Sequence, residues 1–267
     1  MKQLLIPADI INALPKGDAF TQVMQLQGTV FRHVAGRKTI RTQLAGKSLF
    51  VKQHFGVGWA EIFKNLLSFK LPILGALTEV KAIKRLTEIG IATTPLVAYG
   101  VNGTNPAHIK SFVITEDLGD IISLEDLCLE WKNNPPTAQF KRQLITRVAQ
   151  IAKQLHENNL CHRDFYLCHF CLNRRLLSLG QIQFYLIDLH RMKKASQSEK
   201  LKDIAALYFS SLDIGLSPRD YLRFKHFYTQ QNKTFWQKVQ TRASSLYAKF
   251  HGAKFQQKLA NERAALK

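Results

Sequence analysis

The first half of the chain alternates between short apolar and polar runs in the manner of β-strands. Residues 29–34, 39–44 and 48–54 each mix β-branched or aromatic residues with polar ones, and short segments containing Gly36 and Gly46 separate them. Such runs joined by glycine-containing turns are typical of antiparallel strands. A second pair of strands is expected at residues 95–99 and 111–115. The pattern predicts a mostly antiparallel sheet.

Helical periodicity appears between and after these strands. Apolar residues recur every three or four positions in residues 59–67 and 76–89, and Gly90 is the predicted C-terminal cap of the second helix. Beyond Asp120 the pattern is mainly helical, with Ser123 and Thr137 as N-caps and further helices at 203–212 and from 218 onward. The predicted fold class is α+β, with an N-terminal sheet lobe over residues 1–118 and a helical lobe over 119–267.

Charge is the strongest compositional feature, because 38 Lys and Arg residues against 19 acids give a formal net charge of +19. A field of this sign favours anionic partners, namely nucleic acid, an anionic membrane surface, a polyanionic substrate or an acidic protein. No zinc spacing or aromatic RNA-binding signature accompanies the charge, so we expect no nucleic-acid partner. The four cysteines have irregular spacing, and no apolar run reaches the roughly 20 residues of a membrane span. We therefore expect a cytoplasmic protein with reduced thiols.

Two carboxylates, 24 residues apart, carry the main chemical signal. Asp164 lies in a His-Arg-Asp segment, and Asp188 follows an apolar run at residues 182–187 that suits a strand. Phosphoryl transfer of the protein-kinase type uses two such acids, one at the attacking hydroxyl and one on the metal that binds the phosphates. It also uses a strand lysine held by a helix glutamate, and Lys52 and Glu79 occupy such predicted elements. These four residues together predict a phosphotransferase.

Several features have simpler alternatives. Asp164 and Asp188 taken singly suit a turn and a strand end, and Glu88 competes with Glu79 as the partner of Lys52. Cys168-x-x-Cys171 without a second pair is weak evidence for zinc. Gly36 marks a possible phosphate-covering loop, although the full G-x-G-x-x-G series is absent. The amphipathic segment 59–71 is expected to pack against its lobe, with contact to a membrane surface as the alternative.

The chain resembles the lipopolysaccharide core heptose(I) kinases, bacterial sugar kinases with a protein-kinase-like bilobal fold. The resemblance extends from about residue 31 to residue 228 and rests on six ordered segments. These are Gly56–Trp59, Ile62–Leu67, Ser111–Leu118, His162–Phe170, Ile187–Arg191 and Asp203–Ser210. Two histidines depart from the protein-kinase pattern and are shared with the heptose kinases: His169 stands at the position of a metal-binding Asn, and His190 at that of a Gly.

The resemblance implies ATP- and Mg²⁺-dependent phosphorylation of a hydroxyl on the first heptose of the lipopolysaccharide inner core. It implies that Asp164 is the catalytic base and that Lys52 binds phosphates. The residues themselves add that Arg163 beside Asp164 orients the loop, that Glu79 is the partner of Lys52, and that Gly36 would lie in the phosphate-covering turn. Glu116 to Leu118 would contact adenine, and Asp188 and His169 would be the metal-binding residues.

This assignment also sets expectations for partners. The inner core carries carboxylates and phosphates, so a basic enzyme would be attracted to the inner-membrane surface and to its lipopolysaccharide acceptor. A small acidic protein such as acyl carrier protein is a further possible partner. Two alternatives remain open: a kinase-fold phosphotransferase acting on a protein or small molecule, and a non-catalytic module that binds anionic lipid or nucleic acid.

Overall fold

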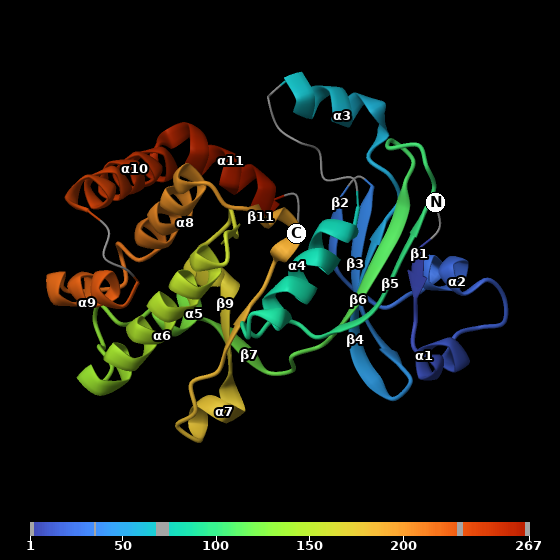
Figure 1. Ribbon diagram of the computed structural model, residues 1–267, viewed down its shortest axis with the longest axis horizontal. Coiled ribbons are helices and arrows are strands. Elements are labelled where there is room, and N and C mark those ends of the chain that lie inside the picture. The colour runs from blue at the N-terminus through green and yellow to red at the C-terminus, as the bar shows by residue number, and fades with distance from the viewer. Residues whose placement is uncertain (1–2, 35, 68–74, 229–231, 265–267) are drawn as a thin grey trace. The chain divides into compact units, whose positions relative to one another are not determined.

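The chain divides into two units in the computed structural model, which describes residues 3–34, 36–67, 75–228 and 232–264 (Figure 1). Unit 1 comprises residues 1–121 together with 184–192, and unit 2 comprises residues 122–183 and 193–267. The predicted fold class is confirmed, because unit 1 contains a large antiparallel sheet and unit 2 is mainly helical. The division into functional lobes at residues 118 and 119 stays a prediction.

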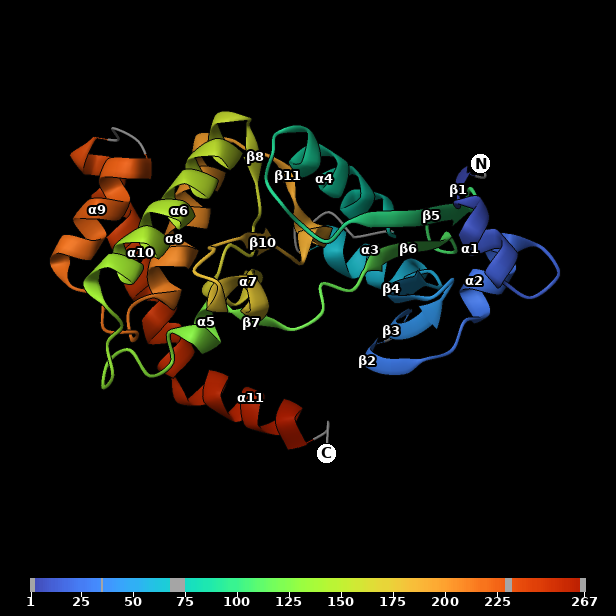
Figure 2. The same cartoon turned by 90° about the horizontal axis from the view of Figure 1, so that it is seen from below.

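Unit 1 is built on a six-stranded sheet with the strand order β1-β5-β6-β4-β3-β2 (Figure 2). Each neighbouring pair is antiparallel. All five strands expected from the sequence are present, some of them longer than predicted, whereas β1, with only three residues, was not predicted. The strands are β1 (Gln3–Leu5), β2 (Thr29–Val34), β3 (Arg37–Leu44), β4 (Lys47–His54), β5 (Leu96–Asn102) and β6 (Lys110–Glu116).

The two faces of this sheet differ in character because side chains alternate along a strand. On one face, an apolar core joins the sheet to α1 (Ala8–Ala13) and α2 (Ala19–Gln25), and the side chain of Gln53 donates to the Val23 and Leu26 carbonyls. On the other face, Lys52 meets α4 (Leu77–Glu88). Helix α3 (Gly58–Leu67) precedes α4 in the chain. The sequence pattern predicted α3 and α4 but missed α1 and α2.

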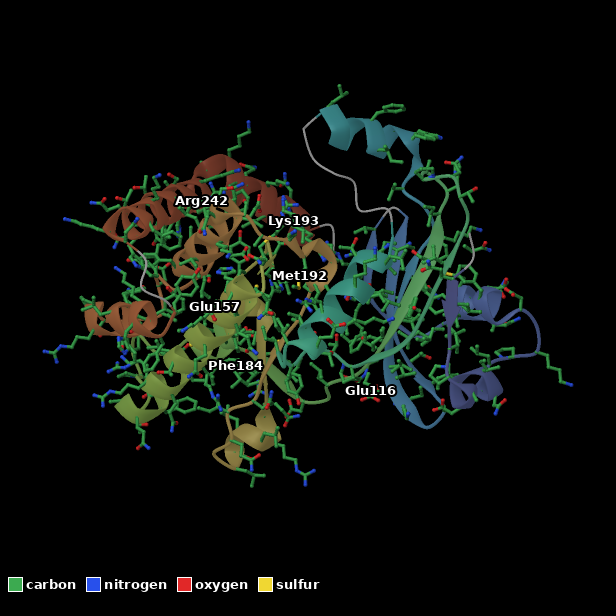
Figure 3. All side chains as sticks on the ribbon, viewed as in Figure 1. Glu116, Glu157, Phe184, Met192, Lys193 and Arg242 are labelled. Atoms are coloured by element: carbon green, nitrogen blue, oxygen red, sulfur yellow. The ribbon has the colours of Figure 1, made fainter. Side chains whose placement is uncertain are left out.

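A later segment of the chain also belongs to unit 1. It contains β10 (Phe184–Leu186) and the short 3-10 helix η2 (Leu189–Arg191), and its end residues Phe184 and Met192 are labelled in Figure 3. The Leu186 N–H donates to the Ala92 carbonyl, and η2 packs against α4. Asp188 therefore belongs to the same unit as Lys52 and Glu79, although 109 residues separate it from Glu79 in the sequence.

Unit 2 is formed mainly by helices. Ser123 and Thr137 accept hydrogen bonds from backbone N–H groups three residues later, which confirms both as N-caps. The strand β7 (Ile121–Ser123) lies where the chain passes from unit 1 to unit 2. The remaining elements are α5 (Leu124–Leu127), α6 (Ala138–Glu157), β8 (Leu160–Cys161), η1 (Leu167–His169), β9 (Phe170–Asn173), α7 (Arg174–Ser178), β11 (Lys193–Lys194), α8 (Gln197–Ser210), α9 (Pro218–Tyr228), α10 (Lys233–His251) and α11 (Ala253–Ala264).

The length and hydropathy of the helices bear on whether any of them could span a membrane. In the part of the chain that the structure describes, no helix has a long enough apolar stretch to cross a bilayer.

Candidate active site

Lys52 and Glu79 form an ion pair on the α4 side of the sheet. The Lys52 Nζ lies 2.5 Å from the Glu79 Oε1, as the sequence order of strand and helix predicted. The Glu79 side chain is 5% exposed and that of Lys52 is 22% exposed. Glu88, the competing partner, instead bonds Arg85 on the helix surface. The pair therefore holds the ammonium in one place while leaving part of it accessible to a ligand.

Gly36 stands at the tight turn between β2 and β3. Its φ is +75°, and a Cβ there would come within 2.4 Å of the Gly56 carbonyl oxygen. The Phe55 N–H donates to the Gly36 carbonyl, which fixes the turn against the end of β4. A side chain at this position is excluded both by backbone strain and by the close approach of Gly56. Contact of Gly36 with a nucleotide stays a prediction.

The segment after β6 is fastened to the neighbouring strands by a residue that sequence reasoning did not single out. Asp117 accepts from the Ser48 hydroxyl and pairs with Arg41, whose Nε lies 2.7 Å from its Oδ2. Glu116, labelled in Figure 3, and Leu118 flank it and are half-buried. The predicted adenine-contacting segment is thus anchored at its centre to β3 and β4.

Asp188 occupies an unusual backbone conformation directly before η2. Its φ of +59° lies in the left-handed region, which Asp tolerates better than most side chains. Its carboxylate contacts the Nδ1 of His190. Its side chain is partly exposed, and the packing of η2 against α4 places the segment in the unit that holds Lys52. Asp188 thus presents an oxygen donor, as a magnesium ligand requires.

The Asp164 loop lies in unit 2 and is held by several backbone contacts. Arg163, next to Asp164, has a φ of +72°, and its Nε lies 3.9 Å from Glu199 in α8. The Nδ1 of His169 lies 2.6 Å from the Asp164 carbonyl oxygen. One ring nitrogen of His169 therefore fastens the loop, and the residue's role as a metal ligand stays a prediction.

Asp203 in α8 is the main residue that sequence reasoning missed. Its carboxylate accepts from the His162 N–H at 2.7 Å and from the Arg163 N–H at 2.8 Å. It also lies 3.3 Å from the Nε2 of His156, whose Nδ1 lies 2.7 Å from the Tyr228 hydroxyl. Burial raises the pKa of Tyr228 above its usual range, so its hydroxyl stays protonated.

This network explains how the loop before Asp164 keeps its shape. A carboxylate has only acceptors, so the Nε2 of His156 donates to Asp203, and the Nδ1 of the same ring is hydrogen-bonded to the Tyr228 hydroxyl. The Ser210 hydroxyl, one helix turn beyond Leu207, accepts from the Leu167 N–H. Helix α8 therefore holds the loop at two points. Asp203 begins one of the six segments that carry the resemblance, but the sequence assigned it no role.

These residues suit a nucleotide and a hard cation. In unit 1, the buried Nε of Arg37 and the buried Nε2 of His54 have no hydrogen-bond partner among the described residues, so both nitrogens can bond a ligand. Mg²⁺ is commonly held by one or two carboxylates together with phosphate oxygens and water, which fits the single carboxylate of Asp188. Within the described parts of the chain, no group of three or more His, Cys, Asp or Glu side chains is arranged as a metal cage.

Three of the four cysteines are not suited to nucleophilic or metal-binding chemistry. Burial raises the pKa of the Cys128 and Cys161 thiols to about 12 and that of Cys171 to about 11. These thiols therefore stay protonated at neutral pH, and protonated thiols are poor nucleophiles and poor metal ligands.

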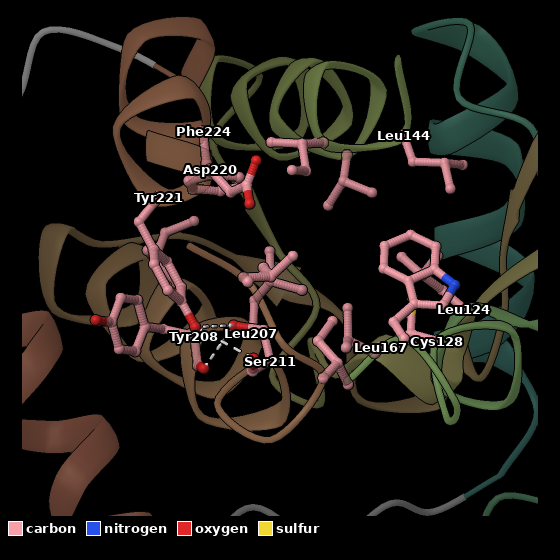
Figure 4. A pocket seen from close by; sticks show the side chains of 16 residues that line it. Leu124, Cys128, Leu144, Leu167, Leu207, Tyr208, Ser211, Asp220, Tyr221 and Phe224 are labelled. Carbon is pink, nitrogen blue, oxygen red and sulfur yellow. Dashed lines mark hydrogen bonds between the residues drawn. The ribbon is translucent and has the colours of Figure 1, made fainter. Parts of the chain in front are cut away.

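Unit 2 also contains an apolar cavity of about 70 Å³ that the sequence pattern did not reveal (Figure 4). Its wall is made by side chains from α5, α6, α8 and α9, and Figure 4 shows the hydrogen-bonded Tyr221 and Ser211 at one end. Each contributing helix has an ordinary apolar stripe, so the stripes alone do not distinguish a filled core from a cavity. The lining residues are Leu124, Cys128, Trp131, Leu144, Ile145, Val148, Leu167, Ile204, Leu207, Tyr208, Ser211, Ile214, Leu216, Asp220, Tyr221 and Phe224.

Comparison with known proteins identifies relatives over most of the chain. The model of the lipopolysaccharide kinase (Kdo/WaaP) family matches residues 21–228. The lipopolysaccharide core heptose(I) kinase WaaP of Pseudomonas aeruginosa is 46% identical over 215 residues, which cover 79% of this chain and 80% of the relative. The enzyme of the same name from Escherichia coli K12 is 45% identical and covers 79% of this chain and 81% of the relative.

A solved structure is similar as well. "WaaP in complex with acyl carrier protein" matches with a TM-score of 0.78 and 35% sequence identity, covering 92% of this chain and 99% of that one.

Proposed function

The chain belongs to the lipopolysaccharide kinase (Kdo/WaaP) family, and we propose that Lys52, Glu79, Asp188 and Asp164 carry out its reaction. It is an ATP-dependent lipopolysaccharide core heptose(I) kinase, like the curated relatives that it matches over four fifths of their length. The resemblance stated from the sequence is therefore confirmed. The assignment of individual residues to steps is our proposal.

Unit 1 binds the nucleotide in this proposal. Glu79 orients the Lys52 ammonium, which neutralises charge on the α and β phosphates. Asp188 holds Mg²⁺, which supplies further positive charge to the phosphates when it is bound. Glu116 and Leu118 contact the adenine, and Asp117 keeps their segment in place through Ser48 and Arg41.

Unit 2 supplies the acid–base chemistry. Asp164 accepts the proton of the attacking heptose hydroxyl, which makes that oxygen a better nucleophile toward the terminal phosphate. Arg163, His162 and Asp203 position Asp164, since the Asp203 carboxylate binds the two backbone N–H groups that precede it. Arg163 touches Glu199 and acts on the loop rather than on the substrate.

The observation that carries this proposal is the partly buried Lys52–Glu79 pair in the same unit as Asp188. The direct test is incubation with γ-labelled ATP, Mg²⁺ and inner-core lipopolysaccharide from which core phosphate has been removed, followed by location of the label on the sugar. Label on the first heptose supports the proposal. Label on a protein or small molecule alone would favour the alternative phosphotransferase, and an absence of transfer would favour the non-catalytic module.

An acidic protein partner is proposed for the same chain. Two observations support acyl carrier protein: the similar solved structure is of a complex with that protein, and this chain has a net charge of +19. The apolar cavity of unit 2 gives a third, because a carried acyl chain needs an apolar site for its end. Co-purification with acylated but not with unacylated carrier protein would support this role of the cavity. Equal binding of both forms would assign the interaction to surface charge.

Peripheral contact with the inner-membrane surface is also proposed. Helix α3 buries Ile62, but Trp59, Phe63 and Leu67 are 46%, 56% and 82% exposed. These three residues recur every four positions and form one stripe, in which Trp59 and Phe63 stack. Among the α3 side chains that the structure describes, the expected packing holds for Ile62, and residues 68–71 of the predicted segment lie outside the described residues. An exposed aromatic stripe on a basic protein suits an anionic lipid interface, where a lipid-anchored acceptor resides.

A further inference from the structure

Two polar side chains in unit 1, the half-buried Arg37 and the buried His54, remain unexplained by the residue roles above. Arg37 begins β3 and His54 ends β4, and the two are direct cross-strand partners. The Arg37 Nε and the His54 Nε2 are buried and lack hydrogen-bond partners among the described residues. His54 is only 6% exposed. Leaving two such groups unpaired costs stability, so a role in ligand binding is a reasonable explanation.

Their position in the sheet indicates which part of a ligand they would meet. Cross-strand partners share a face, and residues two apart on a strand share it too, so Arg37 and His54 lie on the face of Lys52. Along β4, Leu49 pairs with Glu116 in the adenine-contacting segment, and Lys52 comes three residues later. His54 lies two residues beyond Lys52, about 6.6 Å farther from that segment at about 3.3 Å per residue.

This order along the strand matches the order of groups in a nucleotide. The base would lie at the Glu116 end, the α and β phosphates at Lys52, and the terminal phosphate beyond it. The turn that covers phosphates in protein kinases has several glycines, whereas here it has Gly36, fixed to the end of β4 by the Phe55 N–H. This turn lacks the further glycines that let a backbone approach a phosphate closely, whereas the Arg37 side chain directly after Gly36 offers a cation.

The electrostatic surroundings agree with an anion at this point. Burial is the main cause that lowers the pKa of Arg37, and the positive charge of Arg32 lowers it further, while Asp188 and Glu79 oppose the change. Burial also lowers the pKa of His54 to about 4, assisted by the charges of Arg37 and Lys52. His54 is therefore neutral at pH 7 and offers its imidazole as a hydrogen-bonding group without adding charge.

We propose that the Arg37 guanidinium, with the His54 imidazole beside it, binds the terminal phosphate of ATP in place of a glycine-rich loop. The inference rests on the proposed kinase function and assigns one more contact to its nucleotide site. Arg suits this position because its planar fork of N–H donors matches phosphate oxygens in a bidentate way, which the ammonium of Lys does not. It predicts that Arg37 distinguishes ATP from ADP, whereas Lys52 does not.

The test compares ATP and ADP affinity by titration calorimetry with Mg²⁺ and no acceptor, so that no turnover is needed. Arg37→Ala is expected to weaken ATP binding on the order of tenfold to a hundredfold and ADP binding by less than about threefold. Arg37→Lys is expected to fall between wild type and Arg37→Ala for ATP. His54→Gln is expected to weaken ATP binding by about fivefold at most.

Lys38→Ala is the matched control. Lys38 adjoins Arg37 and has the same charge, but it lies on the opposite face and bonds Gln27. Its removal is expected to leave the ATP-to-ADP affinity ratio unchanged, and thermal unfolding of each variant confirms that it is folded.

The outcomes separate this inference from the function on which it rests. Lys52→Ala is expected to weaken ATP and ADP alike. If wild type binds neither nucleotide, the proposed function itself fails. If wild type and Lys52→Ala behave as expected but folded Arg37→Ala and Arg37→Lys keep the wild-type ATP-to-ADP ratio, only the Arg37 inference is overturned. An equal change in the ratio for Lys38→Ala would also overturn it, because the effect would then be one of general charge.

Discussion

Two buried carboxylates, one in each unit, show different uses of a negative charge. Glu79 in unit 1 contacts one cation, Lys52, whose side chain is partly open to solvent. Asp203 in unit 2 is 1% exposed and receives hydrogen bonds from two backbone N–H groups and from His156. Three of its four oxygen lone-pair positions are thus used by groups that the ligand cannot reach.

The difference indicates how a carboxylate that prepares a ligand site can be told from one that fixes the shape of a loop. A carboxylate saturated by backbone and buried ring donors fixes the shape of a loop. A carboxylate that holds one accessible cation, with unpartnered donors such as those of Arg37 and His54 in the same unit, prepares charge for a ligand. Loss of Asp203 should therefore mainly change stability, and loss of ligand-facing residues should mainly change kinetics.

The largest expected effect comes from Asp164, which shares its loop with the Asp203 contacts. Asp164→Ala should lower kcat by about 10²–10⁴-fold, because a positioned base contributes about that much to a proton transfer. ATP affinity and the free energy of unfolding should stay near wild type, since the base acts on the acceptor. Steady-state kinetics, nucleotide titration and denaturant unfolding measure the three quantities. Wild-type turnover in the folded variant would remove Asp164 from the mechanism.

Unlike Asp164→Ala, Asp203→Ala should lower the free energy of unfolding. It leaves two buried backbone N–H groups and His156 without their acceptor, and we expect the free energy of unfolding to fall by about 3 kcal/mol. Equilibrium urea denaturation measures this change. Asp213→Ala is the control, because that side chain is mostly exposed. A similar loss in both variants would contradict the positioning role of Asp203.

The two carboxylates also differ in how far the sequence revealed them. Glu79 was found because a strand lysine followed by a helix glutamate is a local pattern with known geometry, and Asp164 and Asp188 stand in short motifs. Strands β2 to β6 of the unit 1 sheet and helices α3, α4 and α6 were predicted for the same reason, since periodicity is a local signal. The fold class followed from their order.

The features that the sequence did not reveal depend mostly on contacts between residues far apart in the chain. Asp203 contacts His156, which is 47 residues away in the sequence, and His156 contacts Tyr228, which is 72 residues from it. No spacing rule connects these residues. Helices α1 and α2 have only six and seven residues, too few for a clear period. The partnerless nitrogens of Arg37 and His54 are visible only once the strand register is known.

His54 should make the free energy of unfolding depend on pH. Burial holds its pKa at about 4 in the folded protein, against 6.5 in the unfolded chain, with the charges of Arg37, Lys52 and His190 acting in the same direction. Between these two values the unfolded state binds the extra proton, so stability falls as the pH decreases from 6.5 toward 4. At pH 5 this group should contribute a loss of about 2 kcal/mol relative to pH 7.

The expected result is that His54→Asn removes this part of the acid destabilisation. Unfolding free energies at pH 7 and pH 5 should differ by about 2 kcal/mol less in the variant than in wild type. The exposed His33→Asn change serves as the control for loss of a histidine elsewhere in the same sheet. Identical pH dependence in wild type and His54→Asn would show that His54 does not titrate in this interval.

The smallest expected effect is a change in vesicle binding caused by the exposed apolar residues of α3. In unit 2 a set of apolar side chains encloses a cavity, whereas α3 in unit 1 exposes Trp59, Phe63 and Leu67. We expect wild type to bind vesicles that contain anionic phospholipid, with a blue shift of tryptophan emission as an aromatic ring enters the interface. Replacement of Phe63 and Leu67 by Ala, which keeps Trp59 as the probe, should weaken partitioning on the order of tenfold.

The control for the α3 variant removes a similar amount of exposed apolar side chain from unit 2. Leu179 and Leu222 are 66% and 62% exposed there, and replacing both with Ala should leave vesicle binding unchanged. Vesicles of zwitterionic lipid alone should bind wild type more weakly, because the +19 charge then has no counterpart, and added salt should weaken binding to the anionic vesicles. Equal binding by the α3 and unit 2 variants would assign membrane contact to charge alone, and the exposed stripe of α3 would then need a protein partner to explain it.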